Sequence, residues 1–337
     1  MKRWLKRIGL GISALMIVTL LSGSAWEFVS RRTAAREFPP PGKLVDIGGR
    51  RIQIDCRGEG SPTVVLVSGL DTFGALSWTA VHDSIARTTR TCAYSRAGIM
   101  WSDAGPAVTA KGVAEDLHAT LEKAGENAPF VMVGHSLGGP YIMTYTKYFG
   151  EQVAGLVMVD ASHPEQFARY APIAPEATKL PLTPIKIGAA LGWTGLVRFT
   201  ARGTEAMPNQ SADGLRASSA YISQSINGAL KEAVALEASF LEAGTIRTVG
   251  DRPLIVLTAM LPMTPAQRKL LKLDEQQATA FKDVWKSMHV EEASWSSRGQ
   301  HVVVPDASHY IQFYRPDIVI AAVRSVVDSV RAPRDSR

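Results

Sequence analysis

Short apolar runs alternate with helical patterns over most of the chain after residue 43. The runs are rich in Val, Ile and Leu, which is typical of strands buried on both faces. They occupy residues 63–67, 91–94, 130–133, 155–159, 254–258 and 301–304. Helical patterns occupy residues 77–86, 109–124, 140–149, 274–287 and 316–330. Strands that alternate with helices predict an α/β fold with a mostly parallel sheet.

A β-hairpin is predicted ahead of the first buried run. Residues 44–47 and 51–56 flank the turn Gly48-Gly49, and Ile52 and Ile54 alternate with more polar positions in the second arm. Alternation around a glycine turn is typical of an antiparallel pair. We therefore expect two antiparallel strands at the start of the folded body.

The alternation stops between Pro164 and Gly250. This segment has no clear strand pattern, and its helix-like stretches are 185–199 and 212–241. A helical insertion in an α/β sheet is most simply a cap over a binding site, and a packed surface excursion without substrate contact is the alternative. The expected organisation is an N-terminal segment (1–38), a first part of the core (39–163), a helical cap (164–250) and a second part of the core (251–337).

An uncharged apolar segment, Ile8 to Trp26, follows four basic residues at the N-terminus. Its length is close to the roughly 20 residues that a helix needs to cross the hydrocarbon core. The basic residues favour a cytoplasmic N-terminus, so we expect a single-pass anchor in the cytoplasmic membrane and an extracytoplasmic body. Cleavage of a signal peptide after Gly23-Ser24-Ala25, followed by secretion, is the alternative. Residues 31–42 are charged and then proline-rich, which predicts a spacer that is neither helix nor strand.

The charge distribution argues against a nucleic-acid partner. The formal charge is +6, but residues 1–38 hold seven basic and two acidic residues, leaving 30 basic and 29 acidic residues for the rest. A nearly neutral body lacks the excess of Lys and Arg that is typical of proteins that bind nucleic acid. The seven histidines lack the spacing of ligand pairs, and two cysteines are too few for a structural zinc site. We therefore expect no metal and no cofactor.

The hexapeptide Gly134-His135-Ser136-Leu137-Gly138-Gly139 lies between a predicted strand and a predicted helix. A G-x-S-x-G motif in this context is typical of a nucleophile elbow, in which a tight turn exposes the serine hydroxyl. The Leu137 amide begins the helix and points toward an oxyanion formed beside Ser136. An ordinary glycine-rich turn is the alternative, and the flanking strand and helix favour the elbow.

His309 is the candidate base for Ser136. A serine nucleophile needs a base within hydrogen-bond reach that is oriented by a third group. His309 follows the last predicted strand directly, so we expect it at the same sheet edge as Ser136. His301 begins that strand, and we expect it to be structural.

Over residues 43–331 the chain resembles the α/β-hydrolase fold, and it is similar to the bacterial membrane-anchored branch of esterase-like serine hydrolases. The resemblance is carried by the order of strands, elbow, helical insertion and late histidine. It is also carried by the strings Ser68-Gly69-Leu70-Asp71, Tyr94-Ser95-Arg96-Ala97-Gly98 through Ser102-Asp103, and Val159-Asp160-Ala161-Ser162-His163-Pro164. It implies a mostly parallel eight-stranded sheet with helices on both faces and a helical cap.

The position of the triad acid departs from the pattern of many family members. They carry it after the seventh strand, where this chain has residues 259–264 without a carboxylate. Asp160, after the sixth strand, is the expected replacement, since certain haloalkane dehalogenases take their acid from that position. Asp306, Asp274 and Glu275 are the alternatives.

The resemblance also implies an oxyanion hole and a disulfide. Ser68 stands where members often have histidine, and the backbone amides of Leu70 and Leu137 are the expected oxyanion donors. In this fold the second strand lies antiparallel beside the fourth, so Cys56 and Cys92 are expected to be bonded, in keeping with export. Two buried free cysteines are the alternative.

The expected activity is hydrolysis of a carboxylic ester-like bond through an acyl-enzyme on Ser136. Apolar residues of the insertion, Trp193 and Phe199 among them, indicate a small-molecule substrate with an apolar portion, although helices on a core need such residues anyway. Lactone, amide or thioester hydrolysis and perhydrolysis are alternatives on the same residues. Epoxide hydrolase chemistry is disfavoured because it uses a carboxylate nucleophile. A catalytically silent, envelope-anchored binding protein is the alternative from another class.

Overall fold

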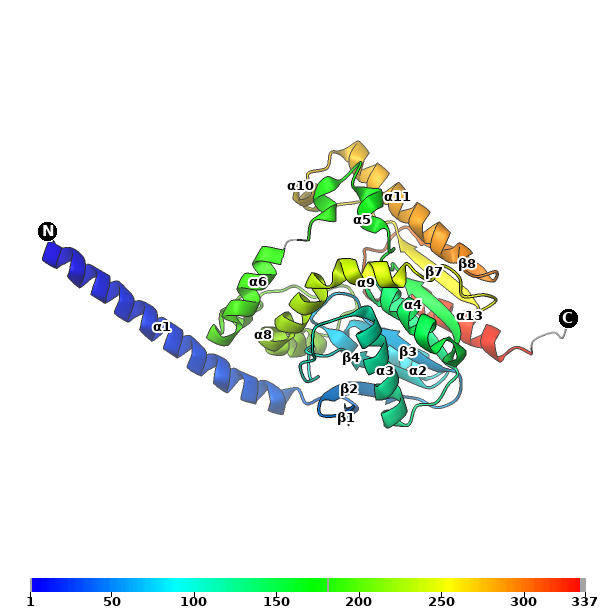
Figure 1. Cartoon of the computed structure of the whole chain (residues 1–337), viewed down its shortest axis with the longest axis horizontal. Helices are drawn as coiled ribbons and strands as arrows, with labels where there is room; N and C mark the ends of the chain where they lie inside the picture. The colour runs from blue at the N-terminus through cyan, green and yellow to red at the C-terminus, as the bar shows by residue number, and fades with distance from the viewer. Residues whose placement is uncertain (1, 181, 334–337) are drawn as a thin grey trace.

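The computed structural model describes residues 2–180 and 182–333 of the chain. One sheet with helices on both faces forms the body, and a long N-terminal helix projects from it (Figure 1). The strands are β1 (Lys43–Asp46), β2 (Arg51–Arg57), β3 (Thr63–Val67), β4 (Thr91–Ser95), β5 (Phe130–His135), β6 (Val153–Val159), β7 (Leu254–Ala259) and β8 (Gly299–Val304).

The helices begin with α1 and end with α13. They are α1 (Lys2–Glu37), α2 (His82–Ala86), α3 (Ala110–Ala124), α4 (Gly138–Phe149), α5 (Gln166–Tyr170), α6 (Leu182–Leu191), α7 (Leu196–Thr200), α8 (Ala212–Val234), α9 (Leu236–Ala243), α10 (Pro265–Leu271), α11 (Glu275–Ser294), α12 (Ile311–Tyr314) and α13 (Pro316–Arg331). Short 3-10 helices are η1 (Gly74–Trp78), η2 (Gly150–Gln152), η3 (Pro175–Thr178) and η4 (Gly192–Thr194).

The strand order across the sheet is β1-β2-β4-β3-β5-β6-β7-β8. Strand β2 runs antiparallel to β1 and β4, and the other neighbouring pairs are parallel. The register pairs His135 with Val159 and Val159 with Leu257, so β5, β6 and β7 bring their carboxyl ends to one level. This arrangement confirms the predicted α/β-hydrolase fold, and it places the loops after these strands side by side.

Alternate residues of the central strands enter two separate cores. Val65 and Val67 of β3 pack in the layer that includes α3, α4 and α9, whereas Val64 and Leu66 pack in the layer that includes α2, α12 and α13. Every residue of β3 is buried. Burial on both faces explains why these strands appear in the sequence as continuous apolar runs rather than as alternating ones.

Several helices differ from the sequence prediction. The stretch 212–241 is divided at Ala235 into α8 and α9, and 77–86 is divided into η1 and α2. The stretch 185–199 is interrupted by η4, which ends at Gly195 in a left-handed conformation with φ +79°. The helices α5, α10 and α12 were not predicted, because segments of four to seven residues carry too few turns to show a helical period.

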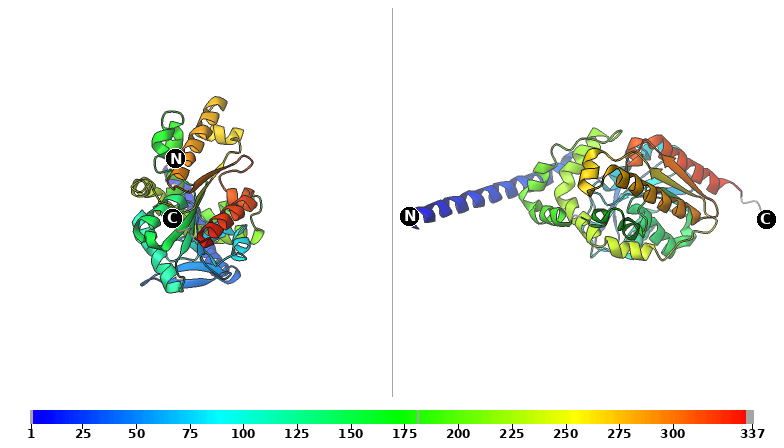
Figure 2. Two further views of the ribbon diagram at one scale, coloured as in Figure 1. Left: turned by 90° about the vertical axis from the view of Figure 1, so that its right-hand side faces the viewer. Right: turned by 90° about the horizontal axis from the view of Figure 1, so that it is seen from above.

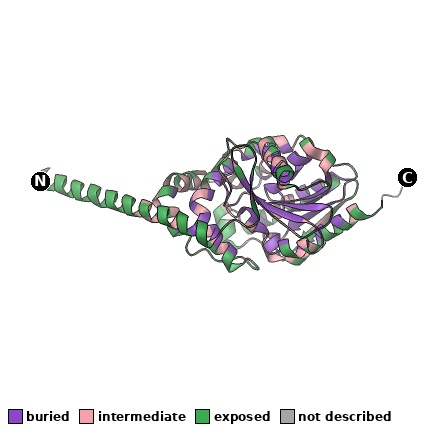
Figure 3. Cartoon of the chain, turned by 90° about the horizontal axis from the view of Figure 1, so that it is seen from below, coloured by how far each residue is buried: buried purple, intermediate pink, exposed green. Residues whose placement is uncertain are grey.

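Helix α1 continues to Glu37, so the prediction of an irregular spacer over 31–42 is wrong for its first seven residues. None of those residues breaks a helix, and Ala34 is buried in a small core that includes Ala217 and Tyr221 of α8. Prolines 39–41 lie just beyond the helix end. Helix α1 is long and apolar enough to cross a membrane, and a signal sequence near the N-terminus would have the same length and composition. Most of α1 is exposed (Figure 3).

Helices α5 to α9 are inserted between β6 and β7 and are called the insertion below. Helix α1 leaves the body beside the part of the insertion that contains α6 and η4 (Figure 2). The far side of the body carries α13 and the C-terminal end of α11 (Figure 1). The insertion therefore links the N-terminal helix to the sheet edge at which β5, β6 and β7 end.

Candidate active site

Ser136 occupies the turn between β5 and α4. Its φ of +51° lies in the left-handed region that residues other than glycine rarely adopt. A Cβ added to Gly134 would lie 2.5 Å from the carbonyl oxygen of Gly138, so this turn requires glycine. A Cβ on Gly69 would lie 2.8 Å from the Ser136 Cβ. Strain at a position fixed by its neighbours is typical of a functional residue.

Asp160 lies directly after β6 and is only 2% exposed. Its Oδ2 accepts a hydrogen bond of 2.7 Å from Nδ1 of His309, which follows β8. Its Oδ1 accepts bonds of 2.8 Å from the Ala259 amide and from Nε1 of Trp285. The φ of Asp160 is +44°, a second left-handed position beside the elbow. Both carboxylate oxygens are thus satisfied although the group is buried.

The charge state of Asp160 follows from two opposing effects. Burial would raise the pKa of its carboxyl, but the hydrogen bond and charge of His309, helped by His289 and Trp285, hold the pKa below its ordinary value. An ionised Asp160 fixes the proton of His309 on Nδ1 and leaves Nε2 free as an acceptor. This is the protonation state that a general base needs.

Ser136, Asp160 and His309 line one cavity of about 410 Å³. The imidazole of His309 is 42% exposed, whereas Asp160 forms the buried end of the pair. Within the described part of the chain, no hydrogen bond joins the Ser136 hydroxyl to His309. The structure therefore brings the three predicted residues to one cavity, with the acid and the base already in contact.

The cavity walls are largely apolar. They come from the insertion, the loop after β7, and helices α10 and α11, and include Tyr170, Ala177, Leu261, Pro262, Met263, Leu271, Phe281 and Trp285. Trp193 and Phe199, which the sequence suggested for substrate contact, are not among the lining residues and are mostly exposed. The helix α6 to α7 region of the insertion turns away from the cavity, a placement that helical periodicity does not encode.

The predicted oxyanion-hole residues belong to two segments that lie close to Ser136. Leu70 follows Gly69, whose backbone approaches the Ser136 side chain, and Leu137 is the next residue along the elbow. Among described residues, neither the Leu70 nor the Leu137 amide donates to a protein acceptor. Two free amides beside a candidate nucleophile are the groups that stabilise an oxyanion.

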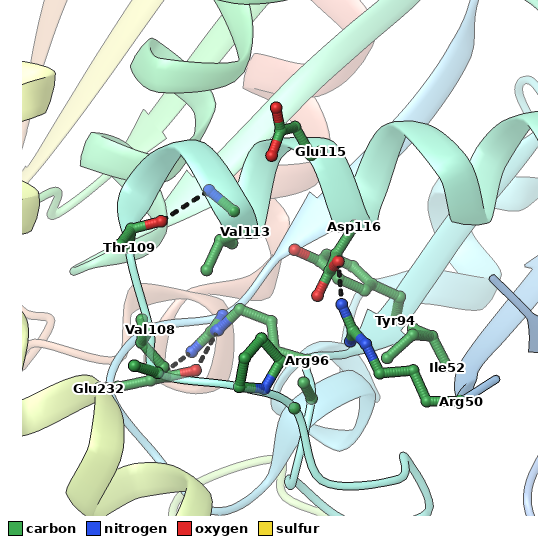
Figure 4. Close-up of a pocket in the computed structure, with 15 residues that line it drawn as sticks. Arg50, Ile52, Tyr94, Arg96, Val108, Thr109, Val113, Glu115, Asp116 and Glu232 are labelled. Carbon is green, nitrogen blue, oxygen red and sulfur yellow. Dashed lines mark hydrogen bonds and ion pairs between the residues drawn. The ribbon is translucent and has the colours of Figure 1, made fainter. Parts of the chain in front are cut away.

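Arg96 holds the loop that carries Leu70. Its guanidinium donates to the carbonyl oxygens of Ser68 and Gly69, both at 2.6 Å. It also forms a two-point ion pair with Glu232 of α8, at 2.6 and 2.8 Å (Figure 4). Burial would lower the pKa of Arg96, but Glu232 raises it above the ordinary value, so the pair is charged. No pattern in the sequence indicated Glu232, which lies 136 residues from Arg96.

The alternative acids are engaged elsewhere. Asp306 pairs with Arg315 at 2.7 Å, and Asp274 caps α11 by accepting from the Gln277 amide at 2.8 Å. Glu275 is highly exposed and lies 3.6 Å from Arg268. Within residues 2–180 and 182–333, only Asp160 accepts a hydrogen bond from the His309 ring.

Neither His135 nor His301 lines the cavity. His135 lies in the elbow, and its Nε2 bonds the carbonyl oxygen of His309 at 3.0 Å. Burial, and then the charge of His309, lower the pKa of His135 to about 3, so it stays neutral. His301 bonds the Thr258 hydroxyl at 2.8 Å, away from the cavity. Sequence reasoning missed the role of His135, although its place in the elbow was visible.

Cys56 and Cys92 face each other in the register of β2 and β4 and form a disulfide. Within the described ranges, these sulfurs and a Glu126 oxygen are the donors close enough to share a metal ion. Because the sulfurs are bonded to each other, they offer no thiolate to a metal. The structure thus places this pair as a cross-strand link between β2 and β4, the second and third strands in the order of the sheet.

The chain has matches among protein families, curated proteins and solved structures. The model of the Alpha/beta hydrolase family matches residues 64–322. A curated relative, Probable transporter efuK from Hormonema carpetanum, is 25% identical over 311 residues, which cover 86% of this chain and 43% of that protein. The chain spans about half or less of the length of the curated relatives it matches.

Two solved structures illustrate the shared fold. A thermophilic esterase from Thermogutta terrifontis is 19% identical with a TM-score of 0.56, covering 86% of this chain and 99% of the esterase. A proposed epoxide hydrolase from Pseudomonas aeruginosa is also 19% identical, with a TM-score of 0.61 and coverage of 87% and 97%. At these identities the likeness shows the fold alone.

Proposed function

This chain belongs to the alpha/beta hydrolase family, and from that premise we propose that it is a serine hydrolase that cleaves carboxylic ester-like bonds through an acyl-enzyme on Ser136. One observation carries the proposal. His309 and Asp160, joined by a hydrogen bond of 2.7 Å, line the same cavity as Ser136, and Ser136 has a left-handed backbone conformation at the elbow. A nucleophile, a base and an orienting acid at one cavity form the arrangement that acyl transfer needs.

In the proposed first half-reaction, Ser136 Oγ attacks the carbonyl carbon of the ester while His309 Nε2 accepts the hydroxyl proton. The carbonyl oxygen becomes an oxyanion, which accepts hydrogen bonds from the Leu70 and Leu137 amides. Collapse of this intermediate breaks the bond to the alcohol oxygen, which takes the proton from His309. Asp160 stabilises the imidazolium between these two proton transfers.

In the second half-reaction, water attacks the acyl-enzyme and gives a proton to His309. The same amides hold the new oxyanion, and its collapse returns the proton to Ser136 Oγ and releases a carboxylic acid. Lactones, amides and thioesters would follow the same steps with other leaving groups. Epoxide hydrolysis through a carboxylate nucleophile does not fit, because serine occupies position 136.

The substrate proposed for this site is a small ester with an apolar portion. The walls contributed by Leu261, Met263, Leu271 and Phe281 support an apolar acyl or alcohol group. Tyr170 and Ala177 of the insertion also line the cavity, which supports a capping role for residues 164–250.

We also propose that α1 is a retained anchor and that the body lies outside the cytoplasmic membrane. The basic residues before Ile8 support this orientation, and the Cys56–Cys92 disulfide supports an oxidising compartment. The apolar part of α1 would then contact lipid.

Labelling of the purified full-length chain with a fluorophosphonate probe tests the proposed nucleophile. We expect Ser136→Ala to abolish labelling, and His309→Ala to slow it by about 10²–10⁴-fold, the usual contribution of a general base. Ser162→Ala is the matched control, because Ser162 lines the same cavity without lying on the elbow. A folded wild-type chain that is not labelled would favour the silent binding protein.

A further inference from the structure

Helix α1 divides into a free part and a docked part. Residues 3–22 are exposed along their whole length (Figure 3). From Gly23 onward one face is covered, with Glu27 and Ala34 fully buried. The covered positions recur at helical spacing, so a single stripe of the helix faces the protein. The docked part of α1 therefore belongs to the body, and the free part leaves it.

The docking surface is the turn formed by η4 and α7. A Cβ on Gly23 would collide with the Thr194 carbonyl oxygen, so the two backbones are in close contact. A Cβ on Gly195 would lie 2.5 Å from the Trp26 ring. Glu27 accepts two hydrogen bonds from Arg198, at 2.8 and 2.9 Å. A buried ion pair beside two glycine contacts fixes this turn to the Gly23–Glu27 stretch of α1.

The length of α1 sets the depth of this contact in a bilayer. A hydrocarbon core of about 30 Å takes about 20 helical residues at 1.5 Å each. If the core begins after Arg7, the last basic residue of the N-terminal group, it ends near Glu27. The stretch Gly23–Glu27 then occupies roughly the last 6 Å of the core and its boundary. The turn that contacts this stretch lies at the same depth.

The residues of this turn that face away from the body are large and apolar. Trp193, Leu196 and Phe199 are 54%, 49% and 64% exposed. Leu196 and Phe199 are three residues apart on α7 and share a face, while Arg198 points to Glu27 instead. None of the three lines the active-site cavity. Placing tryptophan and phenylalanine side chains at the boundary between lipid and water is energetically favourable, whereas exposing them to water is not.

We propose that Trp193, Leu196 and Phe199 form a second membrane contact, which inserts into the lipid–water interface next to α1. The proposal rests on α1 being a retained anchor and is independent of the reaction at Ser136. The occupant of this apolar surface is the bilayer itself, because the transmembrane segment that would carry the surface to lipid is fixed to it by the Glu27–Arg198 pair. The insertion would thereby be held against the membrane.

Depth-dependent fluorescence quenching tests this contact in the full-length chain. Phe199→Cys and Val290→Cys are each labelled with an NBD fluorophore and reconstituted into phosphatidylcholine vesicles with or without doxyl-labelled lipid. Cys56 and Cys92 are bonded to each other, so without reductant only the introduced thiol reacts. Val290 is the matched control, because it is 49% exposed and lies on α11, at the side of the body away from α1 (Figure 1).

We expect the doxyl lipid to quench the probe at Phe199 at least threefold more than the probe at Val290, with a blue-shifted emission at Phe199 only. Equal quenching at the two positions would overturn the proposal. Resistance to carbonate extraction is measured on the same vesicles, and an extractable chain would overturn it as well, since α1 would not be inserted. Fluorophosphonate labelling of each variant reports on Ser136 separately, so failure of the hydrolase proposal is distinguishable from failure of this one.

Discussion

The Asp160→Asn substitution keeps the shape of the side chain but removes its charge and one acceptor oxygen. In the wild type, Oδ1 accepts from the Ala259 amide and from Trp285, and Oδ2 accepts from His309. The asparagine oxygen keeps the first two bonds, because both partners can only donate. Its NH₂ group then faces Nδ1 of His309. His309 must shift its proton to Nε2, and in that tautomer it cannot accept the proton of Ser136.

We expect kcat/KM for a small activated ester such as p-nitrophenyl acetate to fall about 10⁴-fold, the loss found when a triad histidine is held in the wrong tautomer. This corresponds to about 5.4 kcal/mol of transition-state stabilisation. The assay uses the full-length chain in detergent micelles, with initial rates measured below KM. A loss smaller than about tenfold would refute the reasoning and exclude Asp160 as the orienting acid.

Trp285→Phe is the matched control for this prediction. It removes one donor to Oδ1 but leaves the charge of Asp160 and its bond to His309. A neutral hydrogen bond contributes about 1 kcal/mol, so we expect a loss of roughly fivefold in kcat/KM. Equal losses in Trp285→Phe and Asp160→Asn would mean that packing around the carboxylate, and not the tautomer of His309, limits the reaction.

The same pair of proteins predicts a pH dependence of stability. The pKa of Asp160 is lowered in the folded state, because His309 outweighs the effect of burial. A lowered pKa contributes stability that is present above the unfolded value of about 3.9 and is lost as the pH falls through the folded value. The difference in unfolding free energy between wild type and Asp160→Asn, measured in urea, should therefore be larger at pH 6 than at pH 3.

Three further predictions concern groups that support the site. Glu232→Gln leaves the buried Arg96 without its counter-charge, so the unfolding free energy should fall by about 3–5 kcal/mol, while the exposed Glu237→Gln should change it by less than about 0.5 kcal/mol. His135→Ala removes the bond to the His309 carbonyl oxygen and should lower kcat by about fivefold with little change in KM; a changed KM at constant kcat would contradict this. The double substitution Cys56→Ser and Cys92→Ser removes the disulfide and should lower the unfolding free energy by about 2–4 kcal/mol, seen as a lower urea midpoint. The wild-type chain in reductant should unfold at the same lower midpoint. An unchanged midpoint would show that the disulfide does not constrain the unfolded chain.

The strands and the loops between them could be predicted because each strand is marked by the apolar residues of its own segment. Strand β3 matches the predicted apolar run residue for residue, since its side chains are buried on both faces. Chain order then places the residues after β5, β6 and β8 at one edge, which is how Ser136, Asp160 and His309 could be proposed together. The choice of Asp160 also needed the family resemblance, because a buried carboxylate after a strand is not by itself distinctive.

The supporting contacts could not be predicted because they depend on how distant segments meet. Arg96 and Glu232 pair only because α8 folds back over the loop after β3. Trp285 lies in a helix whose sequence pattern does not show which face turns toward Asp160. The docking of α1 is a contact across 171 residues, between Glu27 and Arg198. Periodicity predicts which residues are buried, but it does not select the partner of a buried charge.

The distribution of ion pairs indicates which part of the insertion can move. Helices α7 and α8 are held by the buried pairs Glu27–Arg198 and Arg96–Glu232, and breaking a buried pair costs about 3–5 kcal/mol. The side of the insertion next to the cavity has an exposed ion pair where α7 and α8 have buried ones. Glu176 of η3 reaches Lys272, just after α10, in an exposed pair of 3.4 Å, which water and salt screen, so it contributes little.

Ion pairs therefore oppose opening between η3 and α10 much less than they oppose lifting α8 from the sheet, and the remaining resistance comes from the apolar cluster that Ala177 and Leu271 share. Ala177 and Leu271, which lie next to this exposed pair in the chain, both line the cavity that contains Ser136. Substrate should enter by separating these two segments, while the Arg96–Glu232 pair keeps the Leu70 loop in place. Substrate entry and the proposed oxyanion stabilisation would thus depend on different parts of the insertion, and Lys272→Ala should change KM without changing the rate of the chemical step.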